Sequence, residues 1–355
     1  MPTEQEILQV LSTIQDPDLG KDVVSLGMIK DLDIGSDGRV AFTFELTTPA
    51  CPVKDRFESM AQDLVGALPG VTAVDVKMTS HVRATFAQRQ NLLPGVKQVI
   101  AVASGKGGVG KSTVAVNLAA ALRATGASVG LLDADIYGPS VPAMLGTEDE
   151  PRVVDGKLQP LEAYGLRVIS FGMIAGAEAA LIWRGPMVSK AIGQLFGDVD
   201  WGELDYLVID LPPGTGDASL TVAQAVPLTG VVVVCTPQQV ALNIAVKALQ
   251  MFQRLNVKPL GLVENMSWYV CPDCGHEAHV FDHGGAERAA ERLNVPFLGA
   301  IPLEEAVREE SDLGAPVVVS RPDSPGSKAF AEVAAKVAAQ CSIQSFRQLP
   351  VLNVR

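Results

Sequence analysis

The chain has 355 residues, of which 48% are hydrophobic and 19% charged, a balance typical of a protein that buries a sizeable core. A formal net charge of −12 and an aromatic content of 5% disfavour a general nucleic-acid binder, which needs basic surfaces and stacking platforms. The amino-terminal residues lack a secretory pattern and no apolar run is long enough to span a bilayer, so we expect a cytoplasmic protein without a membrane partner.

Residues 1–88 are predicted to form a small α/β domain. Thr3 followed three residues later by Glu6 is a capping-box pattern, which predicts that a helix opens the chain. Segments that alternate between apolar and polar residues predict strands on either side of a second helix. The expected elements are a helix over Thr3–Ile14, a strand over Val40–Leu46, a helix over Cys51–Leu68 and a strand over Val71–Lys77.

Residues 89–97 contain Asn, Pro and Gly without a period and are predicted to be a linker. In residues 98–341, short runs that are apolar throughout alternate with helical stretches such as Ser112–Ala124 and Gln239–Leu255. This pattern predicts an α/β fold, a parallel sheet covered by helices on both faces. Residues 342–355 are expected to be a loose tail. The strands are expected at Val99–Ala103, Val129–Leu132, Leu166–Phe171, Tyr206–Ile209, Val231–Val234, Leu260–Val263 and Phe297–Ile301.

A phosphate-binding loop follows the first of these strands. It reads GKGGVGKST and matches G-x-x-x-x-G-K-[ST] between a strand and a helix, the context that this motif requires. Glycines let backbone N–H groups approach phosphates, and the helix amino terminus adds partial positive charge. Lys111 is expected to neutralise the β- and γ-phosphates and Ser112 to bind Mg²⁺. We predict a Mg²⁺–ATP site formed by Gly105, Lys106, Gly107, Gly108, Val109, Gly110, Lys111, Ser112 and Thr113.

Two acidic strand ends are expected to complete this site. Tyr206–Asp210 ends in a carboxylate suited to hold Mg²⁺ through water, and it runs into the turn-rich Leu211–Asp217, suited to sense a γ-phosphate. Leu131–Asp135 delivers Asp133 and Asp135, one toward Mg²⁺ and the other toward an attacking water. A strand-terminal Asp also caps helices, but three such carboxylates beside one phosphate loop favour the catalytic role.

The five cysteines are not expected to form a disulfide framework in a cytoplasmic chain of this size. Cys271 and Cys274 form a C-x-x-C pair, which indicates metal binding or redox chemistry. Four thiolates usually hold a [4Fe–4S] cluster, and a two-fold dimer would bring two such pairs together. Zinc bound with nearby histidines and an unliganded redox pair are the alternatives. The histidines that follow the pair are His276, His279 and His283.

The other cysteines carry weaker signals. Cys235 lies in an apolar strand and is most simply a buried hydrophobe, and Cys341 has no ligand-like neighbours. Cys51 opens the expected second helix, where a thiol can have a lowered pKa and serve as a metal ligand or nucleophile. Burial as a packing residue is the alternative for Cys51.

These motifs together resemble the Mrp/ApbC iron–sulfur cluster carriers, within the MinD/ParA/nitrogenase-iron-protein group of P-loop NTPases. Lys106, directly after the first glycine, matches the "deviant" phosphate loop of that group. The part of the chain before the linker resembles a small iron–sulfur assembly domain. The matching segments are Asp133–Pro142 (DADIYGPSVP), Asp210–Asp217 (DLPPGTGD), Glu264–Gly275 (ENMSWYVCPDCG), Asp16–Leu32 (DPDLGKDVVSLGMIKDL) and Thr47–Phe57 (TTPACPVKDRF).

The resemblance implies roles for residues of the phosphate-loop domain. Lys106 would reach across a homodimer to the nucleotide of the other subunit, and Asp135 would position the attacking water, so that Lys106, Lys111 and Asp135 would be catalytic. Asp133 and Asp210 would hold Mg²⁺ through water.

The resemblance also implies ligands for the base and the cluster. Asn265 would hydrogen-bond adenine, and Pro302 would line the base pocket. Cys271 and Cys274 would bind an iron–sulfur cluster shared by two subunits, with Cys51 taking part in its relay.

The sequence therefore predicts a homodimeric, slow ATPase that carries an iron–sulfur cluster, of [4Fe–4S] type, from an assembly scaffold to client apoproteins. A positioning or partition ATPase is one alternative, but it needs a basic amphipathic helix or face, which the alanine-rich Lys328–Gln340 does not provide. An ATP-driven electron-transfer reductase and an ATPase scaffold clipped by zinc are the others.

Overall fold

The fold is described from a computed structural model, which describes residues 1–84, 93–136, 138–147, 149–175 and 195–347. The chain divides into two compact units. The small unit combines Met1–Arg83 with Ala338–Arg355, and the large unit is Ala84–Val337. Both ends of the chain therefore belong to the same unit.

The small unit is a three-stranded sheet with two helices. The capping box is confirmed, because the Thr3 hydroxyl accepts from the Glu6 backbone N–H while the Glu6 carboxylate accepts from Thr3. Alternation along the central strand buries one of its faces against the helices. The elements are α1 (Glu4–Leu11), β1 (Gln15–Asp16), β2 (Lys21–Asp22), β3 (Ile29–Ile34), β4 (Arg39–Leu46), α2 (Lys54–Gly66) and β5 (Ala73–Ser80), with β3 antiparallel and β5 parallel to β4.

The last helix, α12 (Pro325–Arg347), starts in the large unit and ends in the small one. Phe346 packs against the small unit's core, and the Arg83 guanidinium lies 4.4 Å from the centroid of the Phe346 ring. The helix thus continues into the segment from residue 342 that the sequence indicated as a tail.

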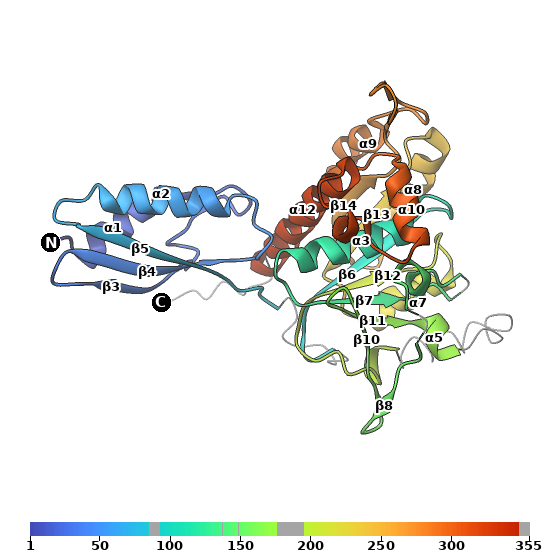
Figure 1. Ribbon diagram of the computed structural model, residues 1–355, viewed down its shortest axis with the longest axis horizontal. Helices are drawn as coiled ribbons and strands as arrows, with labels where there is room; N and C mark the ends of the chain where they lie inside the picture. The colour runs from blue at the N-terminus through green and yellow to red at the C-terminus, as the bar shows by residue number, and fades with distance from the viewer. Residues whose placement is uncertain (85–92, 137, 148, 176–194, 348–355) are drawn as a thin grey trace. The chain divides into compact units, whose positions relative to one another are not determined.

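The large unit is built on an eight-stranded sheet in the order β10-β11-β7-β12-β6-β13-β14-β17, in which every strand except β10 runs parallel to its neighbours (Figure 1). All seven apolar runs expected as strands are strands in the structure. The strands are β6 (Val96–Ser104), β7 (Val129–Asp133), β10 (Leu161–Ala163), β11 (Leu166–Ser170), β12 (Leu204–Asp210), β13 (Gly230–Cys235), β14 (Pro259–Glu264) and β17 (Phe297–Ala300).

Helices cover both faces of this sheet, as expected. Val99, Ala101 and Ala103 of β6 join a buried cluster with α7, α8 and α9. The intervening Ile100 and Val102 point to the opposite face, where α3 packs on β6, β7 and β12 (Figure 1). The bounds of these helices are α3 (Lys111–Ala124), α7 (Asp217–Ala225), α8 (Gln239–Arg254) and α9 (Gly285–Leu293).

The remaining short elements border the sheet. They are α4 (Val141–Met144), β8 (Val153–Val154), β9 (Lys157–Leu158), α5 (Phe171–Ala175), β15 (Tyr269–Val270), β16 (Glu277–Ala278), α10 (Glu305–Asp312) and α11 (Val317–Ser320). A search of the described residues finds no helix with the length and hydropathy that a bilayer crossing requires.

Candidate functional site

The phosphate loop connects β6 to α3 at the carboxyl end of the sheet. Gly110 precedes the helix with φ of 79°, a left-handed conformation that favours glycine. A Cβ on Gly105 would lie 2.6 Å from the backbone carbonyl carbon of Ile244, so only glycine fits against α8 there. The backbone N–H of Gly214 donates to Ser104 and ties the loop after β12 to the start of this loop. Both expected loops of the site therefore meet at one place.

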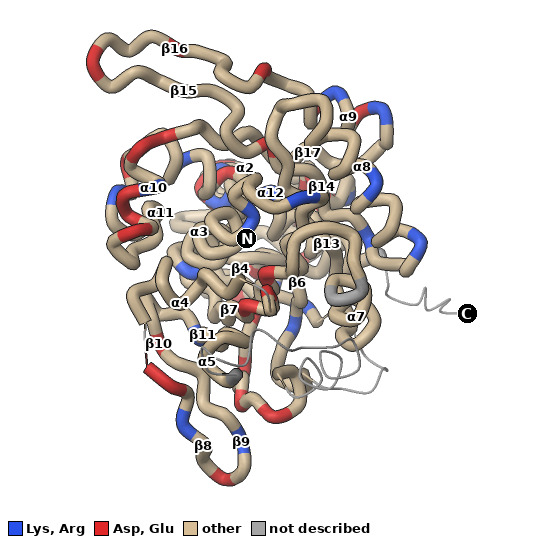
Figure 2. Tube along the Cα trace, turned by 90° about the vertical axis from the view of Figure 1, so that its right-hand side faces the viewer, with Lys and Arg blue, Asp and Glu red and all other residues tan. Residues whose placement is uncertain are grey.

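Lys111 lies buried beneath the loop and faces two carboxylates. Its Nζ is 2.6 Å from Asp210 Oδ1 and 3.7 Å from Asp135 Oδ2, and it donates to Ser112 Oγ at 3.2 Å. Asp210 and Asp133 are direct partners on the adjacent strands β12 and β7, which explains why the acidic residues gather at the ends of these strands (Figure 2). The predicted lysine, hydroxyl and carboxylates thus converge.

The donor set fits a nucleotide-bound Mg²⁺. Asp135 Oδ1 and Asp210 Oδ2 are buried and have no hydrogen-bond partner. An unpartnered buried carboxylate oxygen is costly, and a hydrated divalent cation would satisfy it. Burial is the largest cause of a raised Asp210 pKa, and the Lys111 ammonium opposes that shift. A cation beside Ser112 would add positive charge and, like Lys111, would favour the ionised form of the Asp210 carboxyl.

Asp133 differs from its two neighbours because both of its carboxylate oxygens accept hydrogen bonds. Its carboxylate accepts from the backbone N–H groups of Asp135, Ser140 and Val141 and from the Ser170 hydroxyl. Burial, together with the nearby charge of Asp210, raises the pKa of Asp133 to about 7. These bonds fold the segment after β7 back onto the strand end. Asp133 thus holds the segment that presents Asp135.

Lys106 lies at the open side of the loop and is partly exposed. Its carbonyl accepts from the Ser104 hydroxyl, which fixes the backbone. Among the described residues its ammonium has no ion-pair or hydrogen-bond partner. The structure thus leaves the Lys106 ammonium partly exposed and unpaired within the part of the chain that it describes.

The two residues expected at the base lie in different surroundings. Asn265 follows β14, is buried, and donates from Nδ2 to the carbonyl of Val109 in the phosphate loop at 2.9 Å. Pro302 follows β17 and lines a cavity of about 300 Å³, whose wall also includes Tyr269 and Pro272 beside the cysteine pair. Asn265 is not among the residues that line this cavity.

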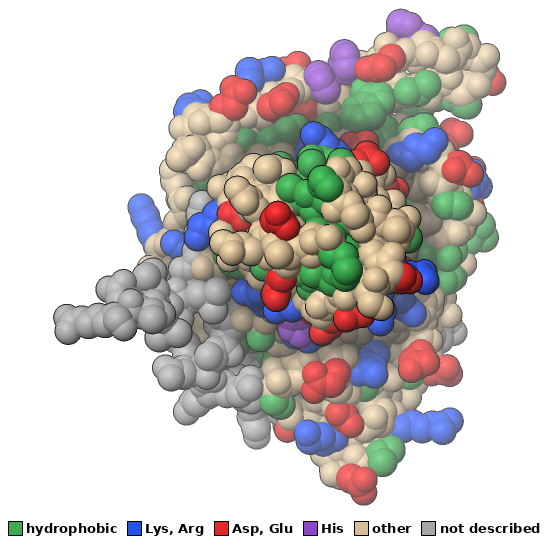
Figure 3. Space-filling view, turned by 90° about the vertical axis from the view of Figure 1, so that its left-hand side faces the viewer, with side chains coloured by type: hydrophobic (Ala, Val, Ile, Leu, Met, Phe, Trp, Pro, Cys, Tyr) green, Lys and Arg blue, Asp and Glu red, His purple; other side chains and the backbone are tan. Residues whose placement is uncertain are grey.

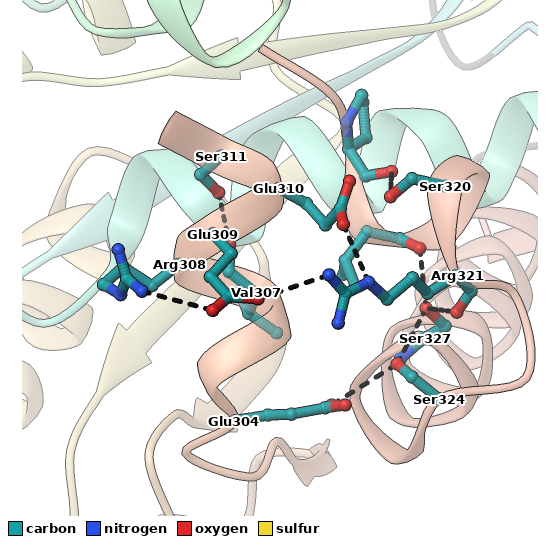
Figure 4. Close-up of polar contacts among 12 residues, drawn as sticks. Glu304, Val307, Arg308, Glu309, Glu310, Ser311, Ser320, Arg321, Ser324 and Ser327 are labelled. Atoms are coloured by element: carbon teal, nitrogen blue, oxygen red, sulfur yellow. Dashed lines mark hydrogen bonds and ion pairs between the residues drawn. The ribbon is translucent and has the colours of Figure 1, made fainter. Parts of the chain in front are cut away.

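Polar contacts support the loop after β17 from behind. Arg321 joins Glu309 and Glu310 of α10, with Nε 2.7 Å from Glu310 Oε1 (Figure 4). Glu304 accepts from the Ser324 hydroxyl and from the backbone N–H of Gly326 at the start of α12. These contacts fix the wall of the cavity next to Pro302.

Cys271 and Cys274 lie in the turn of the β15–β16 hairpin. The backbone N–H of Cys271 donates to His276, and that of Gly275 donates to Cys271, which closes a tight turn around both thiols. Hydrogen bonds from the backbone N–H groups of Cys274 and Asp273 lower the pKa of the Cys271 thiol. Cys271 is partly exposed and Cys274 exposed. The turn thus leaves both thiols accessible and favours the thiolate form of Cys271.

A single-chain zinc site of two cysteines and two histidines is not formed. Among the described residues no three His, Cys, Asp or Glu side chains come together as a metal site. The His279 and His283 rings instead stack with centroids 4.7 Å apart, and histidine side chains lie at the upper edge of the face in Figure 3. His283 Nδ1 is 2.8 Å from Ser267 Oγ.

The predicted helix start at Cys51 was wrong, and Cys51 packs against the core of the small unit, in line with the alternative of a packing residue. Helix α2 starts at Lys54, so Cys51 lies in the turn before it and not in its first turn. Burial raises the pKa of the Cys51 thiol, and Asp16 and Asp18 add to that shift. Cys235 is buried as predicted, and desolvation raises its pKa to about 12. Cys341 is buried as well.

Sequence reasoning missed two residues that organise the site. Ser170 at the end of β11 donates to Asp133, and Glu264 at the end of β14 is fully buried. Glu264 carried a detectable signal, since a carboxylate ends an otherwise apolar strand there as Asp133 and Asp210 do on theirs. Ser170 carried none, because serine is common at strand ends.

Models of two protein families match this chain. Residues 95–338 match a family described as NUBPL iron-transfer P-loop NTPase, and residues 4–76 match one described as iron–sulfur cluster assembly protein. The iron–sulfur cluster carrier protein of Deinococcus radiodurans is 48% identical over 347 residues, covering 97% of each chain.

Two solved structures resemble the large unit. The nucleotide-binding protein of Archaeoglobus fulgidus in complex with ADP has a TM-score of 0.59 and 40% identity, covering 66% of this chain and 93% of that chain. The cell division ATPase MinD of Pyrococcus furiosus has a TM-score of 0.54 and 24% identity, covering 68% of this chain and 98% of that chain, and shares the fold.

Proposed function

Because this chain belongs to the iron–sulfur cluster carrier family of P-loop NTPases, we propose that it binds and hydrolyses ATP while carrying a cluster between two subunits for delivery to apoproteins. The observation that carries the proposal is the pairing of two incomplete sites on one chain. The phosphate loop carries the partly exposed Lys106, and the hairpin carries a partly exposed thiol, Cys271, and an exposed one, Cys274.

Residues of the phosphate loop and the two strand ends would bind Mg²⁺–ATP. Lys111 and Ser112 would hold the phosphates and the cation, and the unpartnered oxygens of Asp135 and Asp210 would accept from its bound water. Asp135 would also position the water that attacks. When bound, ATP supplies the γ-phosphoryl group whose presence the loop after Asp210 senses. Hydrolysis is proposed to be slow, because the nucleotide serves as a switch.

A second copy of the chain would complete both sites. A [4Fe–4S] cluster needs about four thiolates, and each chain contributes Cys271 and Cys274. Lys106 would reach the nucleotide of the other subunit. The same two-fold axis would satisfy both demands, as an isologous interface does. Asn265 and Pro302 would hold the base of the nucleotide. Client apoproteins and an assembly scaffold would be the partners of the dimer in the cytoplasm.

Anaerobic reconstitution with iron and sulfide tests this proposal. We expect an absorption band and an EPR signal of an iron–sulfur cluster after reduction, with about four irons per dimer. Cys271→Ala and Cys274→Ala are expected to abolish the cluster, whereas the matched Cys235→Ala, which removes a buried thiol, is expected to keep it. Equal cluster content in all three variants would contradict the proposal. One zinc ion per dimer instead of an iron–sulfur cluster would favour a zinc-clipped scaffold.

A further inference from the structure

Glu264 holds both ends of the segment that carries the cysteine pair. We define the cysteine segment as residues 265–284, which leave the sheet after β14 and return at the start of α9. At its outgoing end the Glu264 carboxylate accepts from Ser267 Oγ at 2.6 Å. At its returning end the carboxylate accepts from the backbone N–H groups of Gly284 at 2.8 Å and Ala286 at 2.7 Å. The fully buried Glu264 side chain thus joins the two ends of the 20-residue cysteine segment.

The residue next to Glu264 contacts the phosphate loop. Asn265 donates to the Val109 carbonyl, two residues before Lys111. A Cβ on Gly110 would lie 2.2 Å from Asn265 Nδ2, so the amide packs directly on the loop's last glycine. Any change in the backbone of the phosphate loop therefore acts on Asn265, and through the adjoining peptide on the carboxylate that holds the cysteine segment.

The backbone around this pair of residues is itself fixed. The backbone N–H of Asn265 donates to Cys235 on β13, and the Glu264 carbonyl accepts from Ile301 after β17. A rigid strand end transmits a displacement, whereas a flexible one absorbs it. His283 extends the same contacts, because its Nδ1 lies 2.8 Å from Ser267 Oγ and its ring stacks on His279.

We propose that Glu264 is a positioning residue that couples the phosphate loop to the cysteine segment, so that nucleotide binding and cluster binding alter each other's affinity. The inference rests on the proposed function, since it needs a cluster at Cys271 and Cys274. Coupling between two sites is reciprocal, and its usual size is about 5–150-fold in affinity. Glu264 acts through the segment, because its carboxylate is bonded to Ser267, Gly284 and Ala286 and to neither Cys271 nor Cys274.

Glu264→Gln is the informative change, because the amide keeps the volume but replaces one acceptor oxygen by a donor. The single remaining oxygen cannot accept from all three partners, because Ser267 and Gly284 donate to one carboxylate oxygen and Ala286 to the other. The hold on the cysteine segment is therefore weakened while the phosphate loop keeps every residue. The quantity to measure is the ratio of nucleotide dissociation constants, with ADP as the probe, between cluster-loaded and cluster-free protein by anaerobic calorimetry.

We expect a ratio of about fivefold or more, in either direction, for the wild-type chain and a ratio near one for Glu264→Gln. Asp205→Asn is the matched control. Asp205 also accepts three hydrogen bonds, from Lys97 and twice from Ser128, but lies at the opposite end of the sheet. Its variant is expected to keep the wild-type ratio, which separates coupling from a general loss of stability.

A second variant protects the test against misfolding of Glu264→Gln. Ser267→Ala removes the hydroxyl that contacts Glu264 and His283 but keeps both backbone contacts of Glu264, and it is expected to bring the ratio closer to one without changing the circular dichroism spectrum. A wild-type ratio retained in both variants, or a ratio of one in the wild-type chain with its cluster bound, would overturn the coupling while leaving the proposed function intact. A wild-type chain that binds no cluster at its cysteines would overturn both.

Discussion

One buried lysine and two buried carboxylates meet at the end of the sheet, and their hydrogen-bonding groups are not all paired. Lys111 serves two carboxylates, and each carboxylate keeps an oxygen without a hydrogen bond. The Lys111 ammonium offsets the repulsion between the two carboxylates, because it lies within ion-pair distance of both. The same lysine is the group expected to meet phosphate, so ligand binding and local stability depend on one residue.

Lys111→Ala is expected to weaken Mg²⁺–ATP binding about 100-fold, because charge-assisted hydrogen bonds to phosphate are lost. Calorimetric titration measures this affinity. Lys97→Ala is the control, since Lys97 pairs with Asp205 at the opposite end of β6. Undiminished affinity in Lys111→Ala would mean that the phosphates bind elsewhere.

Asp133 makes stability depend on pH in an unusual direction. Its pKa of about 7 lies above the ordinary 3.8, so between these values the folded chain holds a proton that the unfolded chain has lost. Its contribution is therefore complete below about pH 4 and declines as pH rises to 7, by up to about 1.4 kcal/mol per pH unit.

Urea unfolding of nucleotide-free protein at pH 5.0 and 7.5 measures this effect. Asp133→Asn is expected to shrink the loss of stability between the two pH values. Asp205→Asn is expected to leave it unchanged, because the Asp205 pKa is lowered and its contribution is lost only in acid. The same pH difference in wild type and Asp133→Asn would contradict the assignment.

At the scale of elements, the turn from β6 into α3 depends on a glycine with no tolerance for a side chain. Gly110 has φ of 79°, and its Cβ position lies 2.2 Å from Asn265 Nδ2. We expect Gly110→Ala to cost at least about 1–2 kcal/mol of unfolding free energy, the usual penalty of a left-handed residue.

Gly107→Ala is the matched control, because its Cβ position meets nothing within 4 Å. It is expected to change stability by less than about 0.5 kcal/mol. Urea unfolding followed by tryptophan fluorescence reports on the large unit, which contains Trp201 and Trp268. Equal stability of the two variants would show that the turn adapts.

The elements that the sequence predicts well are those with a strong local signal. The apolar runs that became β6, β7, β12 and β13 are buried on both faces, and Thr3 with Glu6 forms its capping box. Short pieces were missed because two or three residues carry no period: β10 pairs antiparallel at the edge, and β15 pairs with β16.

Site residues also divide into those that a local sequence motif predicts and those that only the tertiary fold brings together. Lys111, Ser112, Asp135 and Asp210 follow from the motif and the strand ends, and the structure brings them together. The partners of Glu264 could not be predicted, because Gly284 and Ala286 are about 20 residues away and nothing local says that they return to it. Long-range closure of this kind is a tertiary property.

At the scale of the whole molecule, the small unit is completed by the end of the chain. Phe346 packs on its core beside β3–β5 and under Arg83. Phe346→Ala is expected to destabilise the small unit by about 2 kcal/mol, less than for a fully buried Phe because this ring is partly buried.

Hydrogen exchange measured by mass spectrometry checks this prediction. Faster exchange is expected in β4 and α2 of the Phe346→Ala protein, with the large unit's β6 and β12 unchanged. Leu313→Ala, at a residue that is 76% exposed in the large unit, is the control. Unchanged exchange in β4 would mean that the end of α12 contributes nothing to this core.

The membership of Ala338–Arg347 in the small unit also bears on how the chain folds as it is made. A ribosome synthesises the residues of β3, β4 and β5 well before the residues of α12 that belong to the same unit. Domains usually fold in the order of their synthesis. Here some 250 residues of the large unit separate the two segments of the small unit, so the large unit can acquire its own fold before Phe346 packs on the small unit's core.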